Sequence, residues 1–164
     1  SHIAHDCIIG NNCIMSNNCQ IAGHVSIGDH TILAGMTAVH QFVQIGQHAF
    51  VAGGSLVSKD VPPYIKAGRT PLSYAGVNSV GLKRRGFDSK IIAKIKEAYK
   101  VLYRQGLSLN EAEEKIKILS NYLASKRHEP HWILIWKKMP HCVSNTDFTQ
   151  AAYSMLLLIQ NVFK

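Results

Sequence analysis

Residues 1–58 read SHIAHDCIIGNNCIMSNNCQIAGHVSIGDHTILAGMTAVHQFVQIGQHAFVAGGSLVS, and a six-residue period runs through them without a break. Every sixth residue is apolar and medium-sized: Ile3, Ile9, Met15, Ile21, Ile27, Leu33, Val39, Ile45, Val51 and Val57. The residue that follows is small in nine of these ten hexads, and the exception is His40. A short period with one aliphatic and one small position is typical of a parallel β-helix, in which each hexad forms a short strand and a corner.

The composition predicts a folded protein rather than a disordered one. The chain has 164 residues, of which 46% are apolar and 17% charged, and this suits one globular unit with an appendage. The most apolar stretch near its end, residues 155–159, is far shorter than the roughly 20 residues that cross a bilayer, and no signal peptide is visible. We therefore expect a cytoplasmic protein. Its cysteines show neither CxxC nor zinc-ligand spacing, which favours free thiols.

Three segments follow one another along the chain. Residues 1–58 carry the hexads, residues 59–87 are punctuated by proline and glycine and predict a loop and linker region, and residues 88–164 predict a helical domain. Asp88 and Ser108 are the predicted caps of its first two helices, and Pro130 and Thr146 are candidate starts of two more. Because the first hexad lies in register without a capping element, we expect that coils before it are missing.

The formal net charge is +8, and basic residues gather in the run Lys83, Arg84 and Arg85 and along the helix after it. Such a cluster could attract an anionic ligand or an acidic protein, or it could be a solvated helix face. Nucleic acid is disfavoured as a partner, because no zinc finger, recognition helix or aromatic platform accompanies the charge.

The hexads also predict which side chains meet. If three hexads form one coil, residues 18 apart stack at a spacing of about 4.8 Å. His5 then lies below Gly23 and Gln41, Asp6 lies below His24, and His40 is adjacent in the sequence to Gln41, so the histidines of three coils gather at one corner. His2 lies three residues before His5 on the same coil. A purely polar surface ladder is the structural alternative to a site here.

This corner has the residue types that a general-base mechanism requires. Histidine titrates near neutral pH and can take a proton from a hydroxyl or an amine. Asp6 could orient His5, provided that the backbone turns between them, because neighbours in a strand point in opposite directions. Gly23 has no side chain, so its backbone N–H could donate to an oxyanion. His30 and His48, with Asn12, form a separate polar stack at another corner.

Several motifs together resemble one bacterial enzyme family. They are His2-Ile3-Ala4-His5-Asp6-Cys7, Ala22-Gly23-His24-Val25, Gly35-Met36-Thr37-Ala38-Val39-His40-Gln41-Phe42, Asp60-Val61-Pro62-Pro63-Tyr64, Gly76-Val77-Asn78 and Gly81-Leu82-Lys83-Arg84-Arg85-Gly86-Phe87. Over about residues 1–123 the chain closely resembles the acyl-carrier-protein:UDP-N-acetylglucosamine O-acyltransferases, which open lipid A biosynthesis. The resemblance implies a mainly β fold, in which a left-handed parallel β-helix is followed by a C-terminal α-helical domain. It also implies a homotrimer with sites between subunits.

The resemblance also implies roles for individual residues. His5 matches the general base that deprotonates the 3-hydroxyl of UDP-N-acetylglucosamine, Asp6 its partner, and Gly23 the donor to the oxyanion. The residues that match contacts to the sugar and the acyl-pantetheine are His2, His24, His40 and Gln41. Those that match contacts to the nucleotide, phosphate or acyl carrier protein are Asn78, Arg84 and Arg85. No cofactor and no metal are implied.

Two further positions concern specificity. Gly53 matches the place at which the family limits the length of the (R)-3-hydroxyacyl chain, and a glycine there leaves room for a longer chain. Val80 departs from the pattern, because relatives carry an acidic residue near the nucleotide at this position. Residues 124–164 depart from it as well.

Three other functions stay open at this point. A β-helix with histidines also describes the γ-class carbonic anhydrases, in which zinc activates water between subunits. A sibling acyltransferase family N-acylates a glucosamine amine, although it lacks the Lys-Arg-Arg loop. The chain could also be an inactive fragment or a scaffold.

Overall fold

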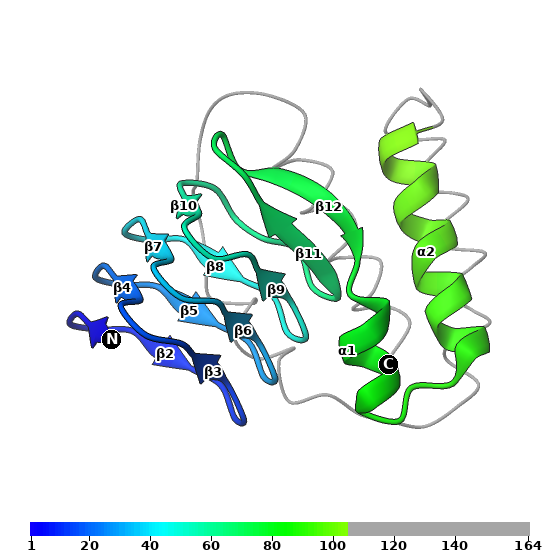
Figure 1. Ribbon diagram of the computed structural model, residues 1–164, viewed down its shortest axis with the longest axis horizontal. Helices are drawn as coiled ribbons and strands as arrows, with labels where there is room; N and C mark the ends of the chain where they lie inside the picture. The colour runs from blue at the N-terminus through cyan, green and yellow to red at the C-terminus, as the bar shows by residue number, and fades with distance from the viewer. Residues whose placement is uncertain (105–164) are drawn as a thin grey trace. The chain divides into compact units, whose positions relative to one another are not determined.

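The computed structural model describes residues 1–104, and their hexads form a parallel β-helix (Figure 1). Ten two-residue strands follow the six-residue period: β1 (His2–Ile3), β2 (Ile8–Ile9), β3 (Ile14–Met15), β4 (Gln20–Ile21), β5 (Ser26–Ile27), β6 (Ile32–Leu33), β7 (Ala38–Val39), β8 (Gln44–Ile45), β9 (Phe50–Val51) and β10 (Leu56–Val57). They stack into three parallel sheets, ordered β1-β4-β7-β10, β2-β5-β8 and β3-β6-β9, the last of which continues further. The predicted parallel β-helix followed by helices is confirmed, and its left-handed sense stays a prediction.

The register of 18 residues is confirmed by the strand pairs. His2 pairs with Gln20, Ile8 with Ser26, and Ile14 with Ile32, each in parallel. The second residue of each strand points into the coil, where Ile21, Leu33 and their equivalents are almost fully buried. The equivalents in the first coil are less buried, and Ile3 is 45% exposed. The β-helix core is therefore a stack of aliphatic side chains contributed once per hexad.

Every corner needs a residue in the left-handed region of the backbone. The residues with positive φ recur every six positions: Asp6, Asn12, Asn18, His24, His30, Met36, Phe42, His48 and Gly54. Asparagine, aspartate, histidine and glycine tolerate this conformation, whereas bulky apolar residues rarely adopt it. Met36 and Phe42 are the two costly exceptions.

The segment 59–87, for which the sequence predicts loop and linker, contains regular structure. It forms β11 (Ile65–Gly68), β12 (Ser73–Val77) and the short helix α1 (Ser79–Arg84). β11 continues the sheet of β9 in parallel, and β12 pairs with β11 antiparallel. Lys66 lies beside Phe50, a step of 16 residues, so the coil that holds Pro62 and Pro63 is two residues shorter than the others. Composition alone could not predict this pairing, because the neighbouring coil supplies its hydrogen bonds.

The helix predicted after Asp88 is α2 (Ser89–Arg104), and an Asp88 carboxylate oxygen accepts a hydrogen bond from the Lys90 N–H. The helix starts predicted at Ser108, Pro130 and Thr146 lie outside the described residues. The chain divides into two compact units, residues 1–92 and 93–164, so the unit boundary falls inside α2. Neither of the described helices is long and apolar enough to cross a membrane.

Candidate active site

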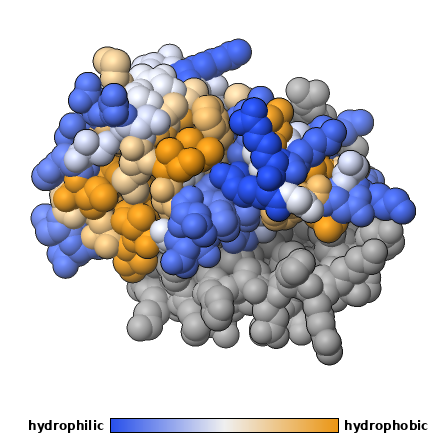
Figure 2. Space-filling model, turned by 60° about the horizontal axis from the view of Figure 1, so that its bottom comes forward, coloured by the Kyte–Doolittle hydropathy of each residue, from blue (hydrophilic) through white to orange (hydrophobic). Residues whose placement is uncertain are grey.

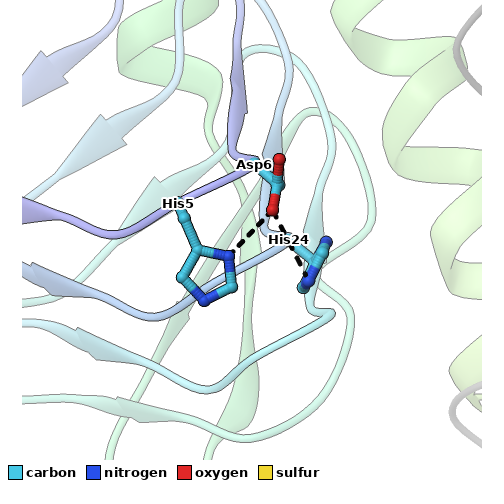
Figure 3. A group of neighbouring side chains, drawn as sticks. All are labelled: His5, Asp6 and His24. Atoms are coloured by element: carbon cyan, nitrogen blue, oxygen red, sulfur yellow. Dashed lines mark hydrogen bonds and ion pairs between the residues drawn. The ribbon is translucent and has the colours of Figure 1, made fainter.

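His5 and Asp6 lie at the corner between β1 and β2, and their side chains meet there (Figure 3). Asp6 has a φ of 57°, so the backbone turns sharply at this residue and both side chains lie on the same side. His5 Nδ1 is 2.9 Å from Asp6 Oδ2. Both side chains are largely exposed, at 72% and 67%. The backbone turn that lets these two neighbours in the sequence meet is therefore present.

The contact sets the proton positions on His5. An ionised carboxylate only accepts hydrogen bonds, so Nδ1 donates its proton to Asp6, and in the neutral form of the imidazole Nε2 then has a free lone pair. The hydrogen bond from His5, together with the charge of His24, lowers the pKa of the Asp6 carboxyl below its ordinary value of 3.8. Asp6 is thus ionised at neutral pH, and His5 is oriented as a proton acceptor at Nε2.

His24, on the next coil, adds a second imidazole to the corner. Its Nε2 is 3.9 Å from the same Asp6 oxygen, and its ring meets His5 edge to face, with centroids 5.0 Å apart. The backbone N–H of His24 donates to the His5 carbonyl, which locks the two coils in register. His5, Asp6 and His24 form what we call the histidine corner (Figure 3).

Gly23 lies directly against the His5 ring. A Cβ atom at this position would come within 2.8 Å of His5 Cε1 and 2.9 Å of Nε2, so a glycine is what lets the imidazole lie here. No acceptor among residues 1–104 meets the Gly23 N–H. An uncommitted backbone donor beside an imidazole that can accept a proton is an arrangement that could stabilise a tetrahedral oxyanion.

Another corner of the coil shows that an oxygen atom can reach a backbone N–H in the position of Gly23. Asn11 occupies the same place in its hexad as Gly23, and its N–H donates to Asp29 Oδ1 at 2.6 Å. The carboxylate comes from the coil above, where it fills the space that Gly10 leaves open. Above Gly23 the equivalent residue is Gln41, which makes no such bond to it. Within residues 1–104, the Gly23 N–H at the histidine corner is therefore unpaired, whereas the equivalent Asn11 N–H is bonded to Asp29.

The other predicted residues of this region make no hydrogen bond, ion pair or ring contact with the histidine corner within residues 1–104. His2 is exposed on the outer face of β1. His40 and Gln41 are exposed two coils above His5, and His40 Nδ1 lies 3.2 Å from the Gln41 carbonyl oxygen. In the described part of the chain, no hydrogen bond joins these three side chains to His5.

The predicted nucleotide contacts belong to a different corner. His30 and His48 stack there with ring centroids 4.8 Å apart, and Tyr64 continues the stack. Asn78 is buried, donates from Nδ2 to the His48 carbonyl, and accepts the Gly81 N–H at the start of α1. Its side chain thus has a structural role, and its predicted contact to a nucleotide stays a prediction.

The two arginines of this second corner differ. Arg85 donates from Nη2 to the His30 carbonyl at 2.8 Å, whereas Arg84 is exposed. Burial, followed by the charges of His30 and Arg85, lowers the pKa of His48 from 6.5 to about 4, so this imidazole is neutral at pH 7. Arg85 therefore lies at the corner of His30 and not at the histidine corner.

Gly53 and Val80 are both exposed. A Cβ atom at Gly53 would come within 3.0 Å of the Gly35 carbonyl oxygen of the coil below, so a side chain here requires a small shift of that neighbour. Val80 lies in the first turn of α1. The acyl-length role of Gly53 stays a prediction.

One neighbour of the histidine corner was not among the predicted site residues. Phe42 stacks on His24 with ring centroids 4.9 Å apart and ring planes within 8° of parallel. The 18-residue register contains the signal, because Asp6, His24 and Phe42 are 18 residues apart in succession. Phe42 could therefore have been found from the sequence, as an aromatic residue in the same column as Asp6 and His24.

The coils define a hexapeptide-repeat parallel β-helix, and one of its corners holds a histidine–aspartate pair beside a glycine amide. A family model described as UDP N-acetylglucosamine O-acyltransferase, domain 2, matches residues 60–134. The acyl-[acyl-carrier-protein]–UDP-N-acetylglucosamine O-acyltransferase of Thiobacillus denitrificans is 47% identical over 115 residues, which are 70% of this chain and 45% of that protein. The enzyme of the same name from Aliivibrio salmonicida is 51% identical over 71% of this chain and 44% of its own length.

Solved structures agree with these sequence matches. The UDP-N-acetylglucosamine acyltransferase of Francisella novicida matches with a TM-score of 0.70 at 48% identity, over 74% of this chain and 45% of that one. The Arabidopsis enzyme matches with a TM-score of 0.71 at 33% identity, over 99% of this chain and 50% of that one. The chain belongs to the UDP-N-acetylglucosamine O-acyltransferase family, and it spans about half the length of the relatives it matches.

Proposed function

We propose that the protein is an O-acyltransferase that moves an (R)-3-hydroxyacyl group from acyl carrier protein to the 3-hydroxyl of UDP-N-acetylglucosamine, the first step of lipid A biosynthesis. The relatives' names support the two substrates. The observation that carries the mechanism is the 2.9 Å contact of His5 with Asp6 beside the uncommitted N–H of Gly23. A cytoplasmic location stays a prediction.

The proposed reaction uses three groups of the histidine corner. His5 Nε2 takes the proton of the sugar hydroxyl while the hydroxyl oxygen attacks the carbonyl carbon of the thioester. The Gly23 N–H donates to the oxyanion of the tetrahedral intermediate. The intermediate then collapses, the carbon–sulfur bond breaks, and His5 returns the proton to the sulfur of the carrier protein. Asp6 stays ionised throughout and stabilises the His5 imidazolium.

The remaining site residues are proposed as substrate contacts. His2, His24, His40 and Gln41 would contact the sugar and the acyl-pantetheine near the histidine corner. Arg84 would contact the nucleotide, its phosphates or the carrier protein. Arg85 and Asn78 would do the same after breaking their present hydrogen bonds. Arginine suits phosphate because its planar fork donates to two oxygens at once. Gly53 would leave room for a longer acyl chain than a bulky residue would.

A homotrimer would reconcile the two corners. Arg85 bonds to the His30 carbonyl and not to the histidine corner, so in a trimer a site that uses His5 and this arginine would draw them from neighbouring copies. The β-helix also exposes apolar residues on its outer faces, among them Ile8 at 50% and Ile14 at 53%, and Figure 2 shows apolar groups gathered on the coil surface. Sedimentation equilibrium tests this proposal: a trimeric mass supports it, and a monomer at micromolar concentration contradicts it.

The experiment that tests the function is an acyl-transfer assay of the full-length protein. It uses UDP-N-acetylglucosamine and carrier-protein thioesters of several chain lengths. Esterification at the 3-hydroxyl with one of these thioesters is the expected result. Failure with every thioester, together with activity on an acylated glucosamine amine, would favour the N-acyltransferase. Failure on both acceptors would favour an inactive scaffold.

One observation favours the zinc alternative. His5, Asp6 and His24 offer ligand atoms within 4.8 Å of one another. Against zinc, the 2.9 Å contact commits the Asp6 oxygen to the His5 Nδ1–H, which is the place of a carboxylate that orients a histidine rather than of a metal ligand. His5 Nε2 and His24 would then be two protein ligands, one fewer than a catalytic zinc site has. Metal analysis of the purified protein separates the two functions, because stoichiometric zinc would support a hydratase and contradict the proposed acyl transfer.

A further inference from the structure

The stack of Phe42 on His24 has no role in the proposed chemistry so far. The phenyl ring covers one face of the imidazole at a centroid distance of 4.9 Å, almost parallel to it. His24 also meets the His5 ring edge to face, and its Nε2 lies 3.9 Å from the Asp6 carboxylate. His24 is therefore held between an aromatic face on one coil and the base with its partner on another.

Phe42 occupies an unfavourable place for a phenylalanine. Its φ is 65°, a conformation that bulky residues rarely adopt, and the residue is 52% exposed to solvent. Asparagine or glycine would fit this corner at less cost, as Asn12, Asn18 and Gly54 do at others. The one aromatic contact of Phe42 within residues 1–104 is its stack on His24. The stack on His24 is thus the favourable contact that offsets the cost of an exposed ring in a strained backbone conformation.

We propose that Phe42 is a positioning residue of the acyl-transfer site, which fixes the His24 imidazole over Asp6 for its contact with substrate. The proposal rests on the proposed function. The His24 side chain is itself 45% exposed and would otherwise rotate in solvent. A ring already ordered by stacking loses less rotational freedom when substrate binds, so the effect falls on substrate affinity more than on the proton transfer at His5.

The test compares two substitutions of similar size. Phe42→Tyr keeps a flat aromatic face, and Phe42→Leu removes it. The leucine variant is expected to raise the KM for the substrate that His24 contacts by roughly 3- to 10-fold with little change in kcat, and the tyrosine variant to keep the original KM. Met36→Leu is the matched control, because Met36 is also an exposed apolar residue at a corner with positive φ and makes no ring contact among the described residues.

Coupling to His24 distinguishes positioning from a direct role. In a His24→Ala background, Phe42→Leu is expected to add nothing to the loss, because the residue through which it acts is gone. Equal effects of Phe42→Leu with and without His24 would overturn the proposal. So would an unchanged KM in Phe42→Leu, or a loss in Phe42→Tyr as large as that in Phe42→Leu.

A measurement without turnover separates this proposal from the proposed function. In the NMR spectrum, the His24 ring protons are expected to carry an upfield ring-current shift that disappears in Phe42→Leu and persists in Phe42→Tyr. Identical His24 shifts in the wild type and Phe42→Leu would overturn the stacking itself. If the stacking signature is present but the wild type transfers no acyl group, the proposed function fails and Phe42 has no acyl-transfer site to position.

Discussion

The histidine corner and the corner of His30 and His48 are built by the same repeat, yet they treat their imidazoles in opposite ways. The side chain of His5 is 72% exposed and bonded to Asp6, whereas His48 is 8% exposed and its Nδ1 has no partner among residues 1–104. At the first corner a carboxylate orients an accessible imidazole. At the second, aromatic neighbours and burial keep the imidazole neutral. The side chains around a corner histidine thus decide whether its imidazole is accessible or buried.

Replacing His5 is expected to have the largest effect. His5→Ala removes the proton acceptor and should lower kcat for acyl transfer by roughly 10²- to 10⁴-fold, the usual contribution of a general base. Because His5 is exposed, urea unfolding should show nearly the wild-type free energy. His48→Ala is the matched control, since it leaves a cavity in a buried stack and should lower the free energy of unfolding by about 2 kcal/mol or more. Unchanged turnover in His5→Ala would rule out its assignment as the base.

The second corner predicts a pH dependence of stability. The pKa of His48 is about 4 in the folded chain and 6.5 in the unfolded one, so the unfolded state binds this proton first as the pH falls. The contribution of His48 is fully present above pH 6.5 and is lost between pH 6.5 and pH 4. It amounts to about 3 kcal/mol.

His48→Phe isolates this term, because phenylalanine keeps the stack and cannot titrate. Urea unfolding at pH 7.5 and pH 4 should show a drop in the free energy of unfolding that is larger in the wild type than in His48→Phe by about 3 kcal/mol. The same drop in both proteins would mean that His48 is protonated at the same pH whether folded or unfolded.

Asp6→Asn tests the partner rather than the base. The asparagine amide is neutral, so it cannot stabilise the His5 imidazolium, and kcat should fall by roughly 10- to 100-fold. Stability should change little, because both side chains are exposed. The kinetics are measured with saturating thioester and sugar nucleotide. Wild-type turnover in Asp6→Asn would show that the 2.9 Å contact is not used in the reaction.

Gly23→Ala tests the contact between Gly23 and the His5 ring, and it is expected to have the smallest effect on kcat. The new methyl group would press on the His5 ring and turn it away from its position, which should lower kcat by about 10-fold. The exposed ring can move, so thermal unfolding should stay close to that of the wild type. Gly35→Ala is the matched control at the same place in another hexad, where a Cβ would make an ordinary contact of 3.4 Å with the Asn17 carbonyl oxygen. Equal losses in both variants would contradict a specific role of Gly23.

Much of the site could be predicted from the sequence because a β-helix repeats a local rule. The step of 18 residues puts Gly23 over His5 and His24 over Asp6 before any coordinates exist, and the strand pairs confirm that register. The same arithmetic separates His30 and His48 into a second stack, which the ring contacts confirm. The family motifs then supplied the roles of these residues, which register alone does not contain.

Several features depended on contacts that no period encodes. The prolines and glycines of residues 59–87 favoured a loop, but the edge of β9 offers unpaired backbone groups that turn residues 65–68 into β11. Asn78 resembled a ligand contact, while in the folded chain it joins α1 to the His48 carbonyl. Phe42 stood in a recognisable motif, and only its ring contact with His24 gave it a role to test.

The sequence by itself determined the coil, its register and the residues that share each corner, since a six-residue alternation of aliphatic and small side chains can bury its apolar positions only by winding. The tertiary structure alone decided which imidazole is bonded, buried or stacked. Those outcomes depend on distances of 3 to 5 Å between side chains from different coils, and on whether α1 and its neighbours cover a corner or leave it open to solvent.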